Sequence, residues 1–335
     1  MSDIRRKGLE FWLSQQLGET CFMEPISGDA SARRYFRFTF EKKTYIAVDA
    51  PPDTENSYLF SAVSKAYAEH QLIVPIVKAI DTDQGFMWLT DLGDQQLFDF
   101  IHEHDAQSYY EASMTCLHAV RHVQKTILGP LPEYDAAMLR AELDLMEEWF
   151  LLQLLKFDLT EDEVTMIKEV KTYLVDCAVQ QPQVGVHRDF HARNIMWHEG
   201  QPAIIDFQGA VVGPVTYDLV SLLKDCYVCW DKDFIDTLLK NAYQELIQAG
   251  WVDQETNWST FKLWFDMMGM QRHIKVLGIF SRLSLRDGKD TYLKDIPLTL
   301  KYVMQVADAY GELQSFSIWL HDKVEPAWEK VCIVQ

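Results

Sequence analysis

One short string in the second half of the chain restricts its possible folds more than any other feature. Residues 187–194 read His-Arg-Asp-Phe-His-Ala-Arg-Asn, and Asp206-Phe207 follows twelve residues after Asn194. The runs VGVHRD, NIMWH and PAIIDF are four to six residues long and read as short strands within an otherwise helical pattern. A turn followed by a hairpin would bring Asp189, Asn194 and Asp206 to one point.

These residue types at this spacing are typical of phosphoryl transfer. The string matches the pattern H-R-D-L-x-x-x-N, with Phe190 in the Leu position. A carboxylate orients the hydroxyl nucleophile and accepts its proton, and hard oxygen ligands bind the Mg²⁺ ions that bridge the β- and γ-phosphates. The sequence therefore predicts Asp189 as the catalytic residue, Asn194 and Asp206 as metal ligands, and ATP with Mg²⁺ as cofactors.

The pattern upstream of this string differs from the pattern around it. With 335 residues the chain is longer than one core usually supports. Strands are predicted at 35–40, 44–50, 72–80 and 86–92, with helices at 4–18 and 56–70. Beyond Gly93 the pattern is mainly helical, at 94–103, 107–127, 136–156, 161–179 and from about 216 onward. We expect an α+β, bilobal, protein-kinase-like fold, with a small β-rich nucleotide-binding lobe (1–93) and a large, mainly helical catalytic and substrate-binding lobe (94–335).

The expected phosphate-covering loop, residues 27–32, holds a single glycine, Gly28. Its small residues would still allow backbone N–H groups to approach phosphate oxygens. Basic residues follow the loop, and they read either as phosphate contacts or as an ordinary basic hairpin edge. The predicted nucleotide contacts are Gly28, Ser31, Arg33, Arg34, Thr90 and Leu92.

The lysine that usually holds the α- and β-phosphates is missing. The chain reads Ile46-Ala47-Val48-Asp49 where V-A-I-K is expected, and Ser61 stands where the helical glutamate partner is expected. Loss of both charges is self-consistent, because neither is left buried and unpaired. Another cation must then neutralise these phosphates, and the candidates are Arg33, Arg34 and Arg37.

Four cations near the C-terminal end share one face of a predicted helix. Arg272, Lys275, Arg282 and Arg286 fall within roughly an 80° arc at 3.6 residues per turn. They read either as a solvated face paired to acids or as a receptor for an anionic substrate group. The candidate substrate contacts are His191, Arg193, Gln208, Asp218 and Arg272, although Asp218 could equally begin a helix or brace the core.

Charge and apolar pattern exclude several classes of partner. The formal net charge of −19 disfavours nucleic acid and anionic lipid. No apolar run is long enough to span a bilayer, and the N-terminus lacks a leader pattern, so we expect a cytoplasmic enzyme without membrane contact. Cys226 and Cys229 have C-x-x-C spacing inside an apolar stretch, which favours buried thiols over a redox or metal site.

Longer strings extend the match to most of the chain. They lie between residues 28 and 297 and read GDASARRYFR, VDAPP, LTDLGD, VHRDFHARNIMW, AIIDFQGAVVGPVTYDLVSLLKDCYV, QRHIKVLGIFSRL, RDGK and YLKDIP. The sequence resembles the aminoglycoside and choline phosphotransferase superfamily, whose loop commonly reads H-x-D-x-H-x-x-N, with His191 as the second His. Within it, the strings resemble the anomeric kinases of N-acetylmuramate and N-acetylglucosamine, which lack the strand lysine.

This resemblance implies phosphorylation of the C1 hydroxyl of an amino sugar in peptidoglycan recycling, with a nucleotidyltransferase using the α-1-phosphate. The lactyl carboxylate of N-acetylmuramate would give the cationic helix face a purpose. Two alternatives stay open: a kinase of another alcohol, such as an aminoglycoside, choline or a different sugar, and a non-catalytic pseudokinase. Arg272 and Lys275 disfavour cationic substrates, and the complete set Asp189, Asn194 and Asp206 disfavours a pseudokinase.

Overall fold

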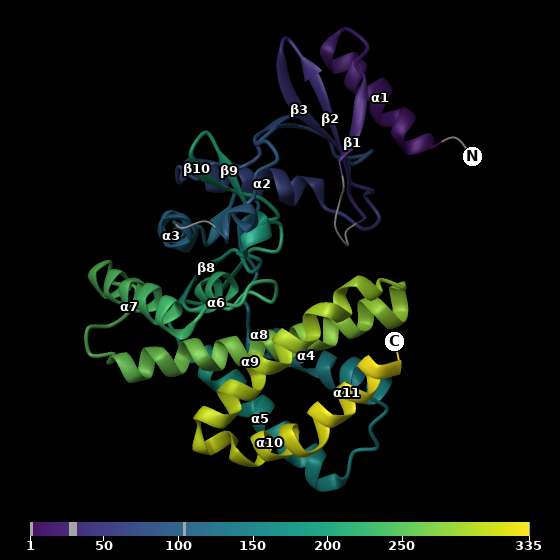
Figure 1. Cartoon of the computed structure of the whole chain (residues 1–335). Coiled ribbons are helices and arrows are strands. Elements are labelled where there is room, and N and C mark those ends of the chain that lie inside the picture. Colours follow the sequence, from purple (N-terminus) through teal and green to yellow (C-terminus); the bar gives the residue numbers. More distant parts are fainter. Residues whose placement is uncertain (1–2, 27–31, 103–104, 335) are drawn as a thin grey trace. The chain divides into compact units, whose positions relative to one another are not determined.

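The computed structural model describes residues 3–26, 32–102 and 105–334, and the chain divides into two compact units (Figure 1). Unit 1 comprises Met1–Leu131 and Ala192–Ala210, and unit 2 comprises Pro132–His191 and Val211–Gln335. None of the helices within the described ranges has the length and apolar character needed to cross a membrane.

Unit 1 is built on a five-stranded antiparallel sheet with the strand order β1-β2-β3-β5-β4. The strands are β1 (Met23–Ile26), β2 (Arg34–Phe40), β3 (Lys43–Asp49), β4 (Val77–Asp81) and β5 (Phe86–Thr90). Glu41 and Lys42 both have positive φ, 47° and 62°, as the tight turn of a two-residue hairpin requires. The predicted strand pattern is therefore realised, although β4 is shorter than the run 72–80.

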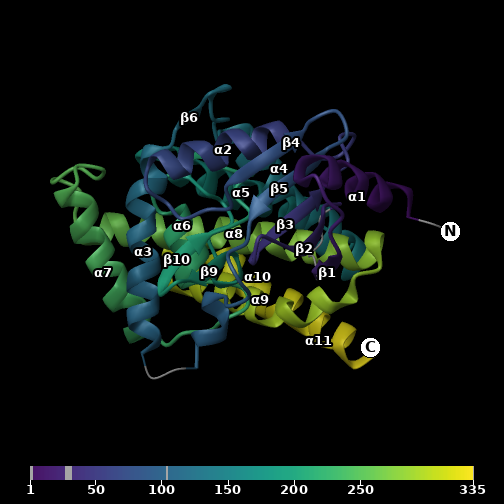
Figure 2. The same ribbon diagram turned by 90° about the horizontal axis from the view of Figure 1, so that it is seen from above.

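A helix covers one face of this sheet (Figure 2). Helix α1 (Ile4–Leu17) begins at Asp3, whose side chain accepts a hydrogen bond from the backbone N–H of Arg6 at 3.0 Å. It buries Leu9, Trp12 and Leu13 against sheet residues that include Phe36 and Phe38. Full burial of each such apolar side chain contributes about 1.5–3 kcal/mol. The second helix of the sheet region is α2 (Ser57–Glu69).

Unit 1 continues beyond the predicted boundary at residue 93. It contains a short 3₁₀ helix (Leu97–Phe100), α3 (Ala106–His122), the small strands β6 (Lys125–Thr126) and β7 (Gly129–Pro130), and the hairpin β9 (Ile195–His198) and β10 (Gln201–Ile204). The division differs because the hairpin binds the preceding segments: the Trp197 N–H donates to the Gln95 carbonyl at 2.7 Å, and the Ile204 N–H donates to the Ile73 carbonyl at 2.8 Å.

Unit 2 is mainly helical. Its elements are α4 (Ala136–Leu145), a π-helical segment (Met146–Leu154), α5 (Glu161–Val179), β8 (Gln183–Val186), β11 (Val211–Pro214), α6 (Tyr217–Leu223), α7 (Lys232–Gln248), α8 (Trp258–Asp287), a 3₁₀ helix (Asp290–Asp295), α9 (Ile296–Ala309), a 3₁₀ turn (Gly311–Leu313), α10 (Gln314–Trp319), a second π-helical segment (Leu320–Val324) and α11 (Glu325–Val334). Strands β8 and β11 pair antiparallel. Together with the sheet of unit 1, this confirms the predicted α+β, kinase-like class.

Helix α8 is the core element of unit 2. It is 30 residues long, packs against α4, α5, α6 and α9, and is buried almost all round between Phe265 and Phe280. Its approach to α4 depends on Gly278, because a Cβ at that position would lie 2.3 Å from the backbone carbon of Leu145. The cations Arg272 and Lys275, about two turns and about one turn earlier on α8, are buried inside the unit.

Candidate active site

A cavity of about 530 Å³ in unit 1 adjoins the end of β5. Its apolar wall includes Ile26, Ile46, Leu89, Met196 and Ile205. The chain leaving β5 forms another side, and this side includes Thr90 and Leu92, both predicted as nucleotide contacts. Small-ligand sites are commonly apolar slots with a few polar groups of this kind. The contact of Thr90 and Leu92 with a nucleotide stays a prediction.

The predicted metal ligands Asn194 and Asp206 line the same cavity. Strands β9 and β10 place Ile195 opposite Ile204, and the Ile205 N–H donates to the Asn194 carbonyl at 3.0 Å. Asn194 directly precedes β9 and Asp206 closely follows β10. Both therefore lie at the open end of one hairpin, as adjacent antiparallel strands dictate.

The backbone at Asp206 is anchored by the next residue. Phe207 is fully buried, with its ring 4.8 Å from that of Phe60 and 5.6 Å from that of Tyr67. Asp206 has a φ of +63°, in the left-handed region that Asp tolerates better than most residues, and its side chain is exposed. The buried ring thus fixes the turn that presents the carboxylate.

The side-chain oxygen atoms at this end of the hairpin are suitable ligands for a Mg²⁺ ion. Gln208 Nε2 donates to Asp206 Oδ1 at 2.6 Å, and within the described ranges no hydrogen bond reaches Oδ2. A carboxylate and an amide oxygen are ligands that Mg²⁺ takes together with substrate phosphates and water. The described residues contain no separate cluster of three or more His, Cys, Asp or Glu side chains arranged for a metal. Gln208, predicted as a substrate contact, is thus engaged with Asp206.

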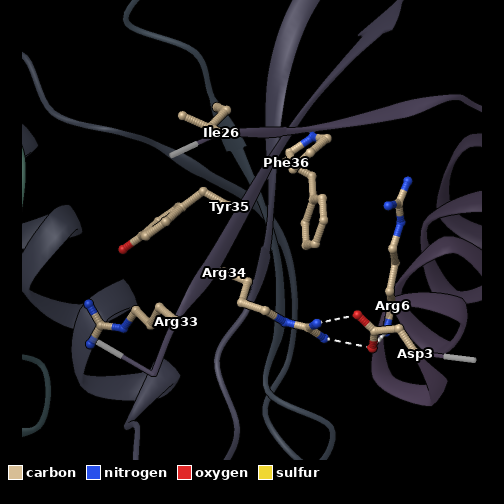
Figure 3. A pocket seen from close by; sticks show the side chains of 8 residues that line it. Asp3, Arg6, Ile26, Arg33, Arg34, Tyr35 and Phe36 are labelled. Carbon is tan, nitrogen blue, oxygen red and sulfur yellow. Dashed lines mark hydrogen bonds and ion pairs between the residues drawn. The ribbon is translucent and has the colours of Figure 1, made fainter. Parts of the chain in front are cut away.

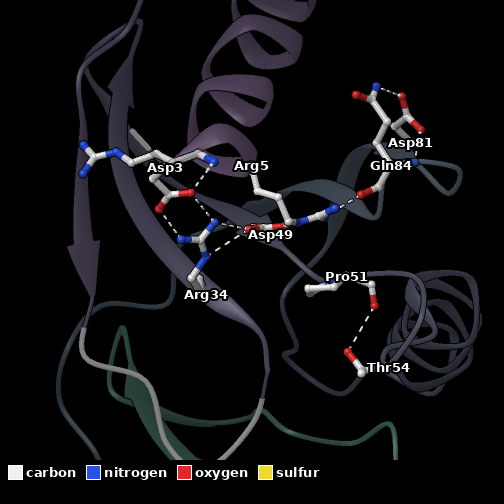
Figure 4. Close-up of polar contacts among 9 residues, drawn as sticks. Asp3, Arg5, Arg34, Asp49, Pro51, Thr54, Asp81 and Gln84 are labelled. Carbon is white, nitrogen blue, oxygen red and sulfur yellow. Dashed lines mark hydrogen bonds and ion pairs between the residues drawn. The ribbon is translucent and has the colours of Figure 1, made fainter. Parts of the chain in front are cut away.

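The three arginines after the expected phosphate loop point in different directions. The loop residues Gly28 and Ser31 themselves lie outside the described ranges. Arg34 forms ion pairs with Asp3 and with Asp49, whose Oδ2 lies 3.0 Å from Arg34 Nε (Figure 4). Arg37 pairs with Asp91 at 2.6 Å and with Asp94 at 2.7 Å. Arg33 pairs with Glu55 at 2.8 Å.

Asp49, which the sequence placed in the position of the missing lysine, does not lie on the cavity side of the sheet. Side chains alternate along a strand, and Ile46 lines the cavity whereas Ala47 packs in the cluster with α1. Asp49 shares the α1 side with Ala47, where it is fully buried and accepts from Arg5 Nε at 2.8 Å (Figure 4). The alignment to V-A-I-K is therefore shifted by one strand position.

Arg193 was predicted as a substrate contact, and the structure puts it on the cavity of unit 1 beside Asn194. Its guanidinium lies over the ring of Phe98 at 4.9 Å from the ring centre. Such a cation–aromatic contact orients the guanidinium.

In unit 2, the turn before Asp189 is held by Asp218. The Asp218 carboxylate accepts the backbone N–H of His187 at 2.8 Å and that of Arg188 at 3.0 Å. Arg188 has a φ of +79°, a conformation that costs a non-glycine residue on the order of 1–3 kcal/mol. Of the two readings left open for Asp218, these contacts support the bracing one.

A second buried carboxylate, Glu142, was not found from the sequence. It accepts hydrogen bonds from Tyr134 and Arg188, lies 3.0 Å from Lys275 Nζ, and accepts from Gln271 Nε2 at 3.3 Å. Burial alone would raise the pKa of Glu142, but Lys275 and Arg188 outweigh it and hold the pKa below its usual value. No motif marks Glu142, because it lies more than 40 residues before the loop that it supports.

Asp189 is half-buried among cations of its own unit. Burial alone would raise the pKa of Asp189, but the charges of Lys275, His191 and Arg272 together hold it below its usual value. The carboxylate is therefore ionised at neutral pH and able to accept a proton. His191, a predicted substrate contact, lies with its ring 5.5 Å from that of Tyr227.

The cations on one face of α8 differ in their exposure to solvent. Arg286 is exposed and pairs with the neighbouring Asp287 at 2.7 Å, as a solvated face would. Arg272 and Lys275 are buried, at 5% and 8% exposure. Arg272 donates to the free thiol of Cys226 at 3.4 Å, and no carboxylate of the described residues lies within 4 Å of its guanidinium. A buried guanidinium that donates to a neutral sulfur is suited to receive an anion.

Replacing Lys275 with Met should move the acid limb of the kcat/KM–pH profile to higher pH. The Lys275 charge favours ionised Asp189, so its removal raises the pKa of Asp189 and the base becomes protonated at a higher pH. A pH–rate series with Mg²⁺ and ATP at saturation measures the shift. Lys171→Met is the matched control, since Lys171 is also buried but pairs with Asp144 and Glu147. An unmoved acid limb would contradict this role of Lys275.

Comparison with known proteins agrees with this geometry. The family described as "Phosphotransferase enzyme family" matches residues 23–253. The N-acetylmuramate/N-acetylglucosamine kinase of Pseudomonas putida is 35% identical, over 93% of this chain and 94% of its own length. The protein of the same name from Pseudomonas aeruginosa is 37% identical, over 90% of this chain and 91% of its own length.

Solved structures show the same fold at low identity. A thermostable mutant of aminoglycoside phosphotransferase APH(4)-Ia in its apo form has a TM-score of 0.60 at 13% identity, covering 90% of this chain and 99% of its own. Plasmodium vivax ethanolamine kinase also has a TM-score of 0.60, at 12% identity, covering 84% of this chain and 82% of its own.

Proposed function

This chain belongs to the phosphotransferase enzyme family, and we propose that it transfers the γ-phosphate of ATP to the C1 hydroxyl of N-acetylmuramate and N-acetylglucosamine. We choose these two substrates because they appear in the names of relatives that match nearly the whole chain. The product would be a sugar α-1-phosphate, a substrate suited to a nucleotidyltransferase.

The chemical roles follow from the two sets of residues. Asp189, held ionised by neighbouring cations, orients the C1 hydroxyl and accepts its proton. Because the ring oxygen makes an anomeric hydroxyl more acidic than an ordinary alcohol, Asp189 acts more as an orienting group than as a strong base. Mg²⁺, when bound, would neutralise charge on the β- and γ-phosphates, and Asn194 and Asp206 would hold it.

For the nucleotide, we propose contacts from the wall of the unit 1 cavity. Thr90 and Leu92 would meet the base, and Gly28 and Ser31 would meet the phosphates. Arg193 shares this cavity with Asn194, which supports a role toward the phosphates rather than toward the sugar. The proposal does not extend to Arg34, since both Asp3 and Asp49 already neutralise it.

For the sugar, we propose His191 and Arg272, which belong to unit 2 with Asp189. Both contribute to the positive potential at the Asp189 carboxylate. The proposal does not extend to Asp218 or Gln208. The carboxylate of Asp218 is engaged with backbone N–H groups, and Gln208 is bonded to Asp206.

The direct test is turnover of ATP with a panel of acceptors, followed by ³¹P NMR of the product. We expect a phosphate at C1 of N-acetylmuramate and N-acetylglucosamine, with no transfer to choline, ethanolamine or an aminoglycoside. A product phosphorylated at C6 would contradict the anomeric assignment. Transfer only to an amino alcohol would favour the broader family activity, and ATP binding without turnover of any acceptor would favour a pseudokinase.

Replacing Arg272 with Gln should penalise N-acetylmuramate selectively. Of the two sugars only the muramate carries a carboxylate, and a hydrogen bond between charged groups contributes about 1.5–3 kcal/mol, or about 10- to 150-fold in kcat/KM. The measurement is the ratio of kcat/KM for the two sugars in the wild type and the variant.

Arg286→Gln is the control on the same helix, because Arg286 is exposed and, among the described residues, forms its ion pair with its neighbour Asp287. It should leave the ratio unchanged. An equal loss on both sugars in Arg272→Gln would mean that Arg272 supports Asp189 or the fold and does not contact the lactyl group. Lys275 would then be the next residue to test by the same ratio.

A further inference from the structure

Arg37 on β2 binds the segment of chain that leaves β5. Its Nε and Nη2 donate to the two carboxylate oxygens of Asp91, at 2.6 and 3.0 Å, and its Nη1 donates to Asp94 Oδ1 at 2.7 Å. Nη2 also donates to the Gly93 carbonyl at 3.2 Å, and Asp91 Oδ1 accepts the Gly93 N–H at 3.0 Å. All three nitrogen atoms of the guanidinium are therefore bonded to residues 91–94.

This cluster forms part of the wall of the unit 1 cavity. Arg37 and residues 90–94 all line that cavity. The segment has a second support, because Nδ1 of His198 lies 3.1 Å from the carbonyl oxygen of Leu92. One side of the cavity is thus a short backbone segment that side chains of β2 and β9 hold in place.

The position of Arg37 in the strand directs its side chain to the cavity. Figure 3 shows Tyr35 extending to one side of β2, whereas Arg34 extends to the other side toward Asp3. Side chains two residues apart on a strand share a face, so Arg37 lies on the same side as Tyr35, and both line the cavity. Strand alternation therefore brings Arg37 to the cavity and takes Arg34 away from it.

The charges of the cluster argue against a phosphate contact by Arg37. Burial alone would raise the pKa of Asp91, but the Arg37 guanidinium and the Gly93 N–H together hold it below its usual value. Two carboxylates, Asp91 and Asp94, face one guanidinium, so negative charge is in excess on this part of the wall. Such an excess repels a triphosphate. The contacts of Arg37 thus serve the segment that it binds.

We propose that Arg37 is a positioning residue for the nucleotide: it holds residues 91–94 in the conformation that binds the base and does not contact the phosphates. The inference rests on the proposed function only in taking ATP as the ligand of this cavity. A ligand that meets a preformed segment loses no binding free energy in ordering it. Arginine suits this task because its rigid, planar guanidinium presents several N–H groups to different acceptors at once.

The test compares the binding of MgATP with that of adenosine, which has the base but no phosphates. The variant is Arg37→Met with Asp91→Asn, because the Asp91 side chain is only 5% exposed and would otherwise keep an unpaired charge. Titration calorimetry without sugar should show both ligands weakened by the same factor. We expect about 5- to 30-fold, which corresponds to ordering the backbone of one more residue on binding.

Two results of this titration would overturn the proposal. Weaker MgATP binding with normal adenosine binding would mean that Arg37 binds phosphate. Unchanged affinity for both ligands would mean that residues 91–94 need no support from Arg37. A wild-type protein that binds neither ligand would overturn both this proposal and the assignment of the cavity to ATP.

Steady-state kinetics with N-acetylglucosamine as acceptor separate positioning of the nucleotide from general damage to the fold. Loss of nucleotide affinity should raise KM for ATP by the same factor and leave kcat at saturating ATP unchanged. A lower kcat with an unchanged KM would contradict the proposal.

The matched control is Arg6→Met with Glu10→Gln. Arg6 also joins a carboxylate and a backbone carbonyl of unit 1, with Nε 3.1 Å from Glu10 Oε1 and Nη2 3.0 Å from the Met23 carbonyl oxygen. This control should bind MgATP and adenosine as the wild type does.

If the Arg37/Asp91 variant does not fold, Arg37→Lys gives the same test. Lysine keeps the charge but cannot donate to both oxygens of Asp91 and to Asp94 at once, so both ligands should again weaken by equal factors. Unchanged binding would overturn the proposal here too. Because the titrations contain no sugar, failure of the wild type to phosphorylate either amino sugar would overturn the proposed function and leave the assignment of Arg37 intact.

Discussion

Asp189→Asn should lower kcat by about 10²–10⁴ while leaving the affinity for MgATP unchanged. The amide has the same shape as the carboxylate but accepts no proton at neutral pH. The substitution also removes the negative charge on which the charges of Lys275, His191 and Arg272 act. The cavity proposed for the nucleotide belongs to unit 1, whereas Asp189 belongs to unit 2, so binding and chemistry should separate.

Steady-state kinetics and nucleotide titration on one preparation measure both quantities. Asp322→Asn is the control, because Asp322 is an exposed carboxylate of unit 2 outside the proposed site. A melting temperature close to that of the wild type would show that Asn leaves the turn at Arg188 intact. Near-wild-type turnover in Asp189→Asn would remove Asp189 from the mechanism.

Asp206→Ala should abolish phosphoryl transfer and weaken ATP binding only when Mg²⁺ is present. It removes the carboxylate at the open end of the β9–β10 hairpin, where Asn194 supplies the only other proposed protein ligand. After the substitution no charged ligand is left in the proposed site, because the amide of Asn194 is neutral. Calorimetric titration of ATP with and without Mg²⁺ measures the effect.

Asp83→Ala is the control for this variant, since Asp83 is an exposed carboxylate in the β4–β5 turn of the same unit. It should retain full Mg²⁺ dependence. If Asp206→Ala kept the dependence of ATP binding on Mg²⁺, the metal would be held elsewhere and Asp206 would act on the backbone turn alone.

The sequence correctly predicted the strands and helices that form because of the pattern of their own residues. The hairpin of β2 and β3 follows from two-residue alternation on either side of a polar turn, and α1 and α5 follow from helical periodicity. The run predicted as a helix at 94–103 forms, within its described residues 94–102, only the 3₁₀ turn Leu97–Phe100. There the backbone of Gln95 and Gln96 pairs with β9, and that long-range pairing competes with helix formation.

Several site residues depended on contacts between distant segments. Glu142 carries no motif, yet it binds Arg188 and Lys275, which lie 46 and 133 residues further along the chain. The side of the sheet on which Asp49 lies depended on strand register, which the pattern V-A-I-K does not specify. The helical spacing of the α8 cations was visible in the sequence, but the packing of α8 against the helices around it decided which of them are buried.

By itself the sequence determined the family and the fold class. It also predicted the residues that carry the chemistry, because Asp189, Asn194 and Asp206 stand at spacings that a turn and a hairpin impose locally. The tertiary structure alone decided which carboxylate each cation meets. Arg33, Arg34 and Arg37 are close neighbours in sequence, but successive side chains of a strand face opposite sides. The acidic partners of these arginines therefore come from other segments of the chain. Glu55 pairs with Arg33, Asp3 and Asp49 pair with Arg34, and Asp91 and Asp94 pair with Arg37.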